Sequence, residues 1–222
     1  MSTESDAKKA VAEKKNNLYK DVVPLASGMF DDNTKVSKEK MIATLHRSIL
    51  GLTKTGEVRP MNDLKLFMAI SSQYSLNPFK KEIYATYIWD SSRQREELIP
   101  IVSIHGLRKL ARKGGVYTHT GPAEIEMSED GKTIVSATVP VFGRWDKTSA
   151  PVEVTRYTAE FSEFARTNKD GELISNWARM PKMMIVKCAE ANALRQGFDI
   201  SGIYIEEEIV ADKVIEGEEV NE

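Results

Sequence analysis

The sequence predicts an α+β fold, in which a small antiparallel sheet built from hairpins packs with helices, one of them a long basic helix near the C-terminus. Apolar residues recur at helical spacing in separate stretches of the chain. Runs rich in β-branched and aromatic residues lie between those stretches and are bounded by polar turns. The predicted strands do not alternate with helices in a βαβ rhythm, so a parallel sheet is disfavoured.

Two helices are predicted in the first third of the chain. Ser37 is a suitable N-cap, and apolar residues follow it at helical spacing: Met41, Ile42, Leu45, Ile49 and Leu52. Gly51 and the turn at 54–56 end this helix. Asn62 is the expected cap of the second helix, which must end before Pro78 because the residue preceding a proline disfavours helical conformation.

A hairpin and a basic helix are predicted next. Residues 83–89 and 98–103 have strand composition, and the polar stretch 90–97 is predicted to be a long loop between them. Residues 104–113 are predicted to form a short basic helix, which Gly114 and Gly115 end.

The second half of the chain is predicted to contain more strands and the long helix. The expected strands cover 123–127, 133–142 and 152–161. A turn at 128–131 separates the first two, and another at 168–171 precedes Trp177. Pro181 suits the first position of a helix that runs to about Arg195 and stops at Gly197.

Composition divides the chain into three parts. Residues 1–35 are polar and expected to be a flexible N-terminal segment, 36–205 hold the predicted elements, and 206–222 form an acidic tail expected to be disordered. No apolar run approaches the roughly 20 residues that span a bilayer. Cys188 is the only cysteine, so an internal disulfide is excluded and a cytoplasmic location is expected, without membrane association.

Charge is distributed unevenly along the chain. The net charge is −2, but eight acids and one lysine from Ile205 onward contribute −7, which leaves +5 on the first 204 residues. A mildly basic body with an acidic tail is common among proteins that handle nucleic acid. An ordinary body with a solvated tail has the same signature, so charge alone does not decide between them.

Three basic clusters are candidates for binding a polyanion. The first is the corner at Pro78, where Lys80 and Lys81 can reach outward without losing a core contact. The second is the helix at 104–113, which has no acid and carries Arg108, Lys109, Arg112 and Lys113. The third is 177–195, where Glu190 is the only acid. Solvated turns and amphipathic surface helices have the same composition, since lysine and arginine are mostly exposed.

Motifs for covalent catalysis are absent from the sequence. It contains no Walker loop, no GxSxG and no HExxH. Acids are abundant, so a metal-dependent nuclease acting on DNA remains an alternative, although the acids cluster in turns and in the tail. An RNA-binding or chaperone module is a further alternative, because the same basic surface can hold RNA.

An ordered set of motifs resembles a known family. The motifs are QYSLNPFKKEIYA at 73–85, PIVSIHG at 100–106, Trp177, PKMMIVKCAE at 181–190, ALRQGF at 193–198 and GIY at 202–204. In this order they resemble the phage single-strand annealing recombinases of the RecT/Bet family, closest to its lambda Red beta branch. The resemblance covers roughly residues 37–208.

The resemblance implies a function and its partners. It implies that 36–205 form an α+β DNA-binding, annealing and oligomerisation domain. The expected protein is a recombinase that anneals strands without ATP and without covalent catalysis, with no cofactor and with Mg²⁺ only as a DNA counterion. Expected partners are single-stranded DNA, annealed duplex, further copies in a ring or helical filament, a phage 5′–3′ exonuclease and a host single-strand-binding protein.

The same resemblance implies which residues contact DNA. They lie at the Pro78 corner, in the hairpin loop, in the turn before the tryptophan, and on or beside the long helix. The expected contacts are Lys80, Lys81, Arg93, Arg95, Lys169, Trp177, Arg179, Lys182, Lys187 and Arg195.

Overall fold

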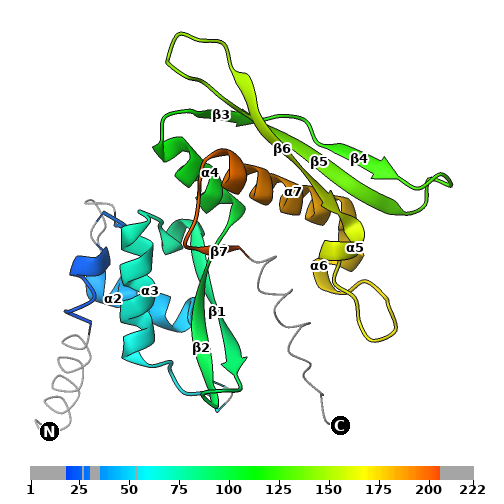
Figure 1. Cartoon of the computed structure of the whole chain (residues 1–222). Coiled ribbons are helices and arrows are strands. Elements are labelled where there is room, and N and C mark those ends of the chain that lie inside the picture. Colours follow the sequence, from blue (N-terminus) through cyan, green and yellow to red (C-terminus); the bar gives the residue numbers. More distant parts are fainter. Residues whose placement is uncertain (1–18, 27, 31–35, 54, 206–222) are drawn as a thin grey trace, which may run out of the picture. The chain divides into compact units, whose positions relative to one another are not determined.

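The computed structural model describes residues 19–26, 28–30, 36–53 and 55–205 (Figure 1). The chain forms two compact units, Met1–Ile101 and Val102–Glu222. Most of the predicted N-terminal segment and all of the predicted acidic tail lie outside the described residues, so the boundaries at 36 and 205 stay predictions. Within the described ranges, no helix has both the length and the apolar character needed to cross a membrane.

The first unit combines helices with a hairpin. Its elements are η1 (Pro24–Ala26), α2 (Lys38–Ser48), α3 (Met61–Gln73), η2 (Pro78–Lys80), β1 (Ile83–Asp90) and β2 (Arg95–Val102, whose last residue opens the second unit). The core residues Ile42 and Leu45 of α2 and Leu64 and Phe67 of α3 are at most 1% exposed. These apolar residues follow the helical spacing predicted from the sequence.

The two helices begin differently from one another. Ser37 caps α2 as predicted, because its Oγ accepts a hydrogen bond from the Lys40 amide at 3.3 Å. The prediction that Asn62 caps α3 is wrong: the helix begins at Met61, and the Pro60 carbonyl accepts from the Asp63 amide at 3.1 Å. Pro60 suits the N-cap position, since its missing N–H removes no hydrogen bond from the helix.

The hairpin is longer than predicted and its loop shorter. β1 and β2 are hydrogen-bonded neighbours, and only residues 91–94 connect them. Asp90 organises this turn, because its Oδ1 accepts from the Ser92 amide at 2.8 Å and from the Arg93 amide at 3.1 Å. Polar residues 95–97 were predicted as loop, but their backbone continues the strand.

A cluster around Arg59 ties the hairpin to α3. The Arg59 guanidinium lies 3.7 Å from the centre of the Tyr87 ring and pairs with Glu96 at 2.5 Å. The Tyr87 hydroxyl donates to Asp63 of α3 at 3.0 Å, and burial together with that carboxylate raises the pKa of the tyrosine. Side chains from both strands therefore contact Arg59, and Tyr87 links them to α3 through Asp63.

The second unit is a sheet with helices on one face. Its elements are α4 (Ile104–Lys113), β3 (Tyr117–Thr120), β4 (Glu124–Met127), β5 (Ile134–Gly143), β6 (Val152–Glu160), α5 (Phe161–Phe164), α6 (Ser175–Arg179), α7 (Pro181–Gly197) and β7 (Tyr204–Ile205). β5 is the central strand: β3 and β4 pair with one side of it and β6 with the other, all antiparallel. The structure therefore confirms the predicted α+β class.

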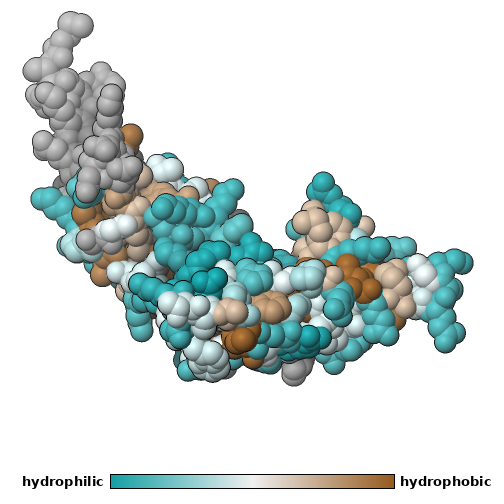
Figure 2. Space-filling view, turned by 90° about the horizontal axis from the view of Figure 1, so that it is seen from above, coloured by the Kyte–Doolittle hydropathy of each residue, from teal (hydrophilic) through white to brown (hydrophobic). Residues whose placement is uncertain are grey.

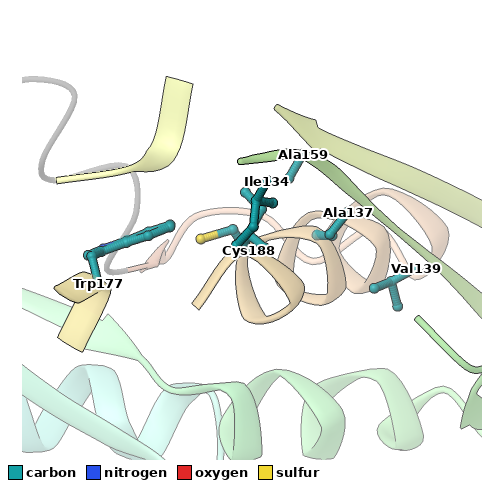
Figure 3. Close-up of a cluster of buried hydrophobic side chains, with 8 residues drawn as sticks. Ile134, Ala137, Val139, Ala159, Trp177 and Cys188 are labelled. Atoms are coloured by element: carbon teal, nitrogen blue, oxygen red, sulfur yellow. The ribbon is translucent and has the colours of Figure 1, made fainter. Parts of the chain in front are cut away.

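Helix α7 covers the sheet and closes the core of this unit. Ala137 and Val139 of β5, Ala159 of β6 and Cys188 of α7 are at most 1% exposed. Figure 3 shows the β5 residues lined up along α7, with Cys188 among them. The sequence prediction that Cys188 is a buried apolar residue is therefore confirmed.

Short elements account for most differences from the predicted fold. The sequence predicted α4 correctly from Ile104 to Lys113, but β3, α5 and α6 were not predicted. Each of these three elements has at most five residues, too few for a periodic apolar pattern. The predicted turn at 168–171 is present, with the Gly171 amide donating to the Asn168 carbonyl at 3.1 Å.

Buried His46 makes the first unit sensitive to acid. His46 is 2% exposed; its Nε2 donates to the Arg59 carbonyl at 2.8 Å, and its Nδ1 lies 3.3 Å from the Tyr19 hydroxyl. Burial lowers the pKa of His46 below its usual 6.5. As pH falls, the unfolded chain therefore takes up the proton first, so the contribution of His46 to stability is complete above pH 6.5 and decreases below it.

We expect His46→Gln to weaken this acid sensitivity. Urea unfolding followed by circular dichroism at two pH values, one on each side of 6.5, measures it. The urea concentration at the unfolding midpoint of wild type should be lower at the acid pH than at the higher pH, and this decrease should be smaller in the variant. His105→Gln, at an exposed position, is the matched control and should keep the wild-type fall. An equal fall in His46→Gln and wild type would contradict the assignment.

Candidate nucleic-acid interface

The corner at Pro78 holds its lysines on a fixed backbone. Asn77 is 6% exposed, and its Oδ1 accepts from the Phe79 amide at 2.9 Å while its Nδ2 donates to the Met29 carbonyl at 2.8 Å. The backbone N–H of Asn77 donates a hydrogen bond to Glu82 Oε2 at 2.7 Å. Lys80 and Lys81 follow on the surface, and Lys81 adopts a left-handed conformation with φ of 56°. The corner therefore presents two exposed ammonium groups from a backbone fixed by a buried asparagine.

The hairpin turn is less positive than the sequence indicated. Arg93 pairs with Glu97, and Arg95 Nη2 lies 3.0 Å from the same carboxylate. Arg93 Nε is also 3.7 Å from Asp90. Both arginines are exposed, and such surface pairs contribute about 0–1 kcal/mol, so a phosphate can compete for them. Their role in binding DNA stays a prediction.

The hairpin turn also lies apart from the corner. β1 has eight residues, which span about 25 Å at the rise of an extended strand. Lys81 precedes this strand and Arg93 follows it. One phosphate group therefore cannot contact both residues of the same copy.

Trp177 does not offer a face for base stacking. Its side chain is 3% exposed, and its ring makes an edge contact with Phe161 at a centroid distance of 5.6 Å. Figure 3 shows it at the end of the buried cluster. This burial leaves little of the ring open to a ligand, and contact between Trp177 and nucleic acid stays a prediction.

Exposed cations surround the start of α7. Arg179 is the last residue of α6 and Lys182 is the second residue of α7, and both are exposed. Met180 offers no side-chain cap to α7, so the first amide groups of the helix add partial positive charge here. Lys169 is exposed as well, on the turn before α6.

A hollow lies between α4 and the first half of α7. Its volume is about 430 Å³, and side chains of α4, α6 and α7 line it, among them Arg108, Met180, Met183, Met184 and Lys187. Met183 is 68% exposed, so the hollow presents apolar surface to solvent next to positive charge. Lys187 is half-buried within this wall.

The far end of α7 differs from its start. Arg195 follows Lys182 by 13 positions, about 20 Å along a helix. It is half-buried, and its Nε donates to the Ile200 carbonyl at 3.3 Å beyond the helix end. Of the cations on α7, Lys182 alone is fully exposed, so a basic surface along the whole helix is not confirmed.

Arg108 on α4 is not part of an open phosphate-binding stripe. Its Nε and Nη2 donate to the two oxygens of Glu190 at 2.7 and 2.8 Å, a bidentate pair between α4 and α7. Thr120 of β3 donates to the same carboxylate at 2.9 Å. Glu190 is 6% exposed, so this pair is a structural link rather than a surface charge.

Sequence reasoning missed one exposed aromatic residue. Trp145 lies between β5 and β6 and is 84% exposed. A tryptophan within the hydrophilic run from Arg144 to Ser149 was a signal that could have identified it. Figure 2 shows small, separate brown patches on a mostly hydrophilic face, and Trp145 heads the exposed large apolar residues of the described chain.

Among the described residues, no group of three or more His, Cys, Asp or Glu side chains is placed to hold a metal ion. The carboxylates with lowered pKa values instead accept hydrogen bonds from nearby groups: Ser92 lowers the pKa of Asp90, and Arg93 lowers that of Glu97. Both carboxylates belong to the hairpin turn.

Two sequence comparisons relate the chain to known proteins. The RecT family model matches residues 47–222. The chain is also similar to the recombination protein bet of Escherichia phage lambda, with 24% identity over 182 residues, which is 82% of this chain. The match spans 61% of the length of that relative.

The Arg108–Glu190 pair leads to a stability prediction. Arg108→Met should destabilise the protein by about 3 kcal/mol, because it leaves a buried carboxylate without its cation. Urea unfolding followed by circular dichroism measures the loss.

Lys113→Met on the same helix is the matched control. Lys113 is exposed, so its replacement should change the free energy of unfolding by less than about 0.5 kcal/mol. Equal stability losses in the two variants would show that the pair does not hold α4 to α7.

Proposed function

Because the chain belongs to the RecT family, we propose that it binds single-stranded DNA and anneals complementary strands in phage homologous recombination, without ATP. The observation that carries the proposal is the family match over residues 47–222. The exposed lysines and arginines at the Pro78 corner and at the start of α7 support it. They suit a ligand that is a polyanion.

Phosphate contact explains how such a protein holds a strand. Lysine and arginine side chains neutralise phosphates and release condensed counterions, so affinity falls steeply with added salt. This energy does not depend on sequence. Lys182 and Arg179 lie three positions apart, and the amide groups at the start of α7 add to the same positive region.

Annealing then needs no fuel from the protein. Duplex formation is downhill once two strands are brought together, and the main barrier is the repulsion between two polyanions. Cations that bind backbones reduce this repulsion and leave the base edges free to pair. Sequence discrimination therefore comes from base pairing, and the protein needs no direct base readout.

Self-association belongs to the same proposal. A strand longer than one binding site must be held by several copies, in a ring or a helical filament. The proposed partners are a phage 5′–3′ exonuclease, which exposes the strands, and a host single-strand-binding protein, which covers them. No covalent step, nucleotide or resident metal is part of this mechanism, and Mg²⁺ acts only as a DNA counterion.

We expect purified protein to convert two complementary labelled oligonucleotides into duplex, without ATP, while total labelled DNA stays constant. Native and denaturing gels of the same reaction, with and without Mg²⁺, measure duplex and strand length separately. Strand shortening in Mg²⁺ would favour a nuclease and contradict the proposal. A strong preference for RNA oligonucleotides in competition would favour the RNA-binding alternative.

Lys81→Gln and Lys182→Gln should each weaken single-strand binding without unfolding the protein. Glutamine keeps most of the side-chain length and removes the charge. Each lost phosphate contact should reduce the slope of log affinity against log salt by about 0.7. Fluorescence anisotropy of a labelled oligonucleotide across a salt series measures the slope.

Two other lysines, half-buried Lys65 and exposed Lys132, serve as matched controls for these variants. Lys65, in the first unit, pairs with Asp21 at 3.2 Å, and Lys132 lies in the turn before β5. Their glutamine variants should keep the wild-type salt slope. If all four variants keep the affinity and salt slope of wild type, neither the corner nor the start of α7 contacts phosphate.

A further inference from the structure

We propose that Trp145, in the turn between β5 and β6, stacks on an unpaired base of the bound strand. This inference rests on the proposed function and adds a contact that the phosphate-binding residues do not provide. Trp145 is 84% exposed, whereas the buried Trp177 is 3% exposed. A tryptophan indole left in solvent exposes a large apolar face, and folded proteins seldom leave one there without a partner.

The turn that carries Trp145 is held in a defined shape. Asp146 Oδ1 accepts hydrogen bonds from the Thr148 amide at 2.8 Å, the Thr148 hydroxyl at 2.7 Å and the Ser149 amide at 2.8 Å. On the other side, the Arg144 amide donates to the Val116 carbonyl at 2.8 Å. Trp145 therefore projects from a backbone anchored on both sides, which reduces the entropy lost when the ring finds a partner.

The charges of the turn favour an anionic ligand. Arg144 and Lys147 flank the ring at the preceding residue and two residues after it. Asp146 is the one acid within 144–149, and its carboxylate already accepts three hydrogen bonds inside the turn, which lower its pKa. Arg144 is half-buried, whereas Lys147 is exposed.

An aromatic ring between two cations suits a nucleic acid strand better than an apolar protein surface. Phosphates can neutralise Arg144 and Lys147, while the base presents a flat face to the indole. Stacking of this kind is nearly independent of sequence, because every base has such a face. It also leaves the hydrogen-bonding edge of the base free, as annealing requires.

The test compares Trp145→Ala with wild type on two strands of equal length, one normal and one with abasic sites at every second position. On the normal strand, we expect the variant to bind about tenfold more weakly, which corresponds to about 1.4 kcal/mol. On the abasic strand, the two proteins should differ by a smaller factor. Trp145→Phe, which keeps an aromatic face, should lie between them on the normal strand.

Val152→Thr is the matched control. Val152 is 42% exposed at the start of β6, so this change removes exposed apolar surface near the same turn. It should leave the affinity for both strands at the wild-type value. Thermal unfolding of every variant should coincide with that of wild type, because an exposed side chain contributes little to the core.

Failure of this inference is distinguishable from failure of the proposed function. If wild type binds and anneals, and Trp145→Ala shows the same affinity on both strands, the stacking role is wrong and the annealing role stands. If Trp145→Ala instead lowers the sedimentation mass of the protein without DNA, the ring contacts a second copy and the inference is overturned. If wild type binds no DNA, the stacking role and the proposed annealing function are both wrong.

Discussion

The packing of α7 on β5 and β6 is the interaction on which the second unit depends. The helix presents small residues to the sheet: Ala189 and Ala193 are fully buried, and a Cβ added at Gly197 would lie 2.8 Å from Thr155 Cγ2 of β6. Close approach of helix and sheet therefore requires glycine at the helix end. Because this face of the helix is used for packing, the cations must lie elsewhere, and the first turn is where Lys182 reaches solvent. The same constraint that builds the core thus concentrates exposed charge at one end of the helix.

Local neutralisation decides which basic residues remain open to a ligand. Glu190 accepts hydrogen bonds from Nε and Nη2 of Arg108 and is itself buried, so loss of the cation leaves a buried charge. Glu97 pairs with Arg93 and Arg95 on the surface, where the pairing energy is small and a phosphate can replace the carboxylate. Two ion pairs of similar length therefore differ in their contribution. The first stabilises the fold, and the second contributes little to stability.

Residues close in the sequence were predicted better than residues that meet through the fold. The cap at Ser37 and the limits of α4 follow from local side-chain chemistry, and both are confirmed. The pairing of Arg108 with Glu190 joins positions 82 apart, so no local pattern indicated it. From the sequence, the helix at 104–113 was a candidate basic cluster with an ordinary surface helix as the alternative. Trp177 and Trp145 show the same limit for aromatic residues. Both lie near basic residues in the sequence, and the fold places one ring in the core and the other in solvent.

An annealing protein must hold a strand firmly and still release its bases to a partner strand. Phosphate contacts meet the first requirement, because their energy comes from counterion release and does not involve the bases. An aromatic stack adds about 1–3 kcal/mol per base and engages only the flat face. When a complementary strand pairs, base-on-base stacking in the duplex competes with the protein ring for that same face. Stacking on a surface tryptophan therefore opposes annealing less than a hydrogen-bonded base contact does, since the indole yields its place without leaving a buried polar group unpaired. A surface of exposed cations with an occasional exposed aromatic ring satisfies both requirements at once.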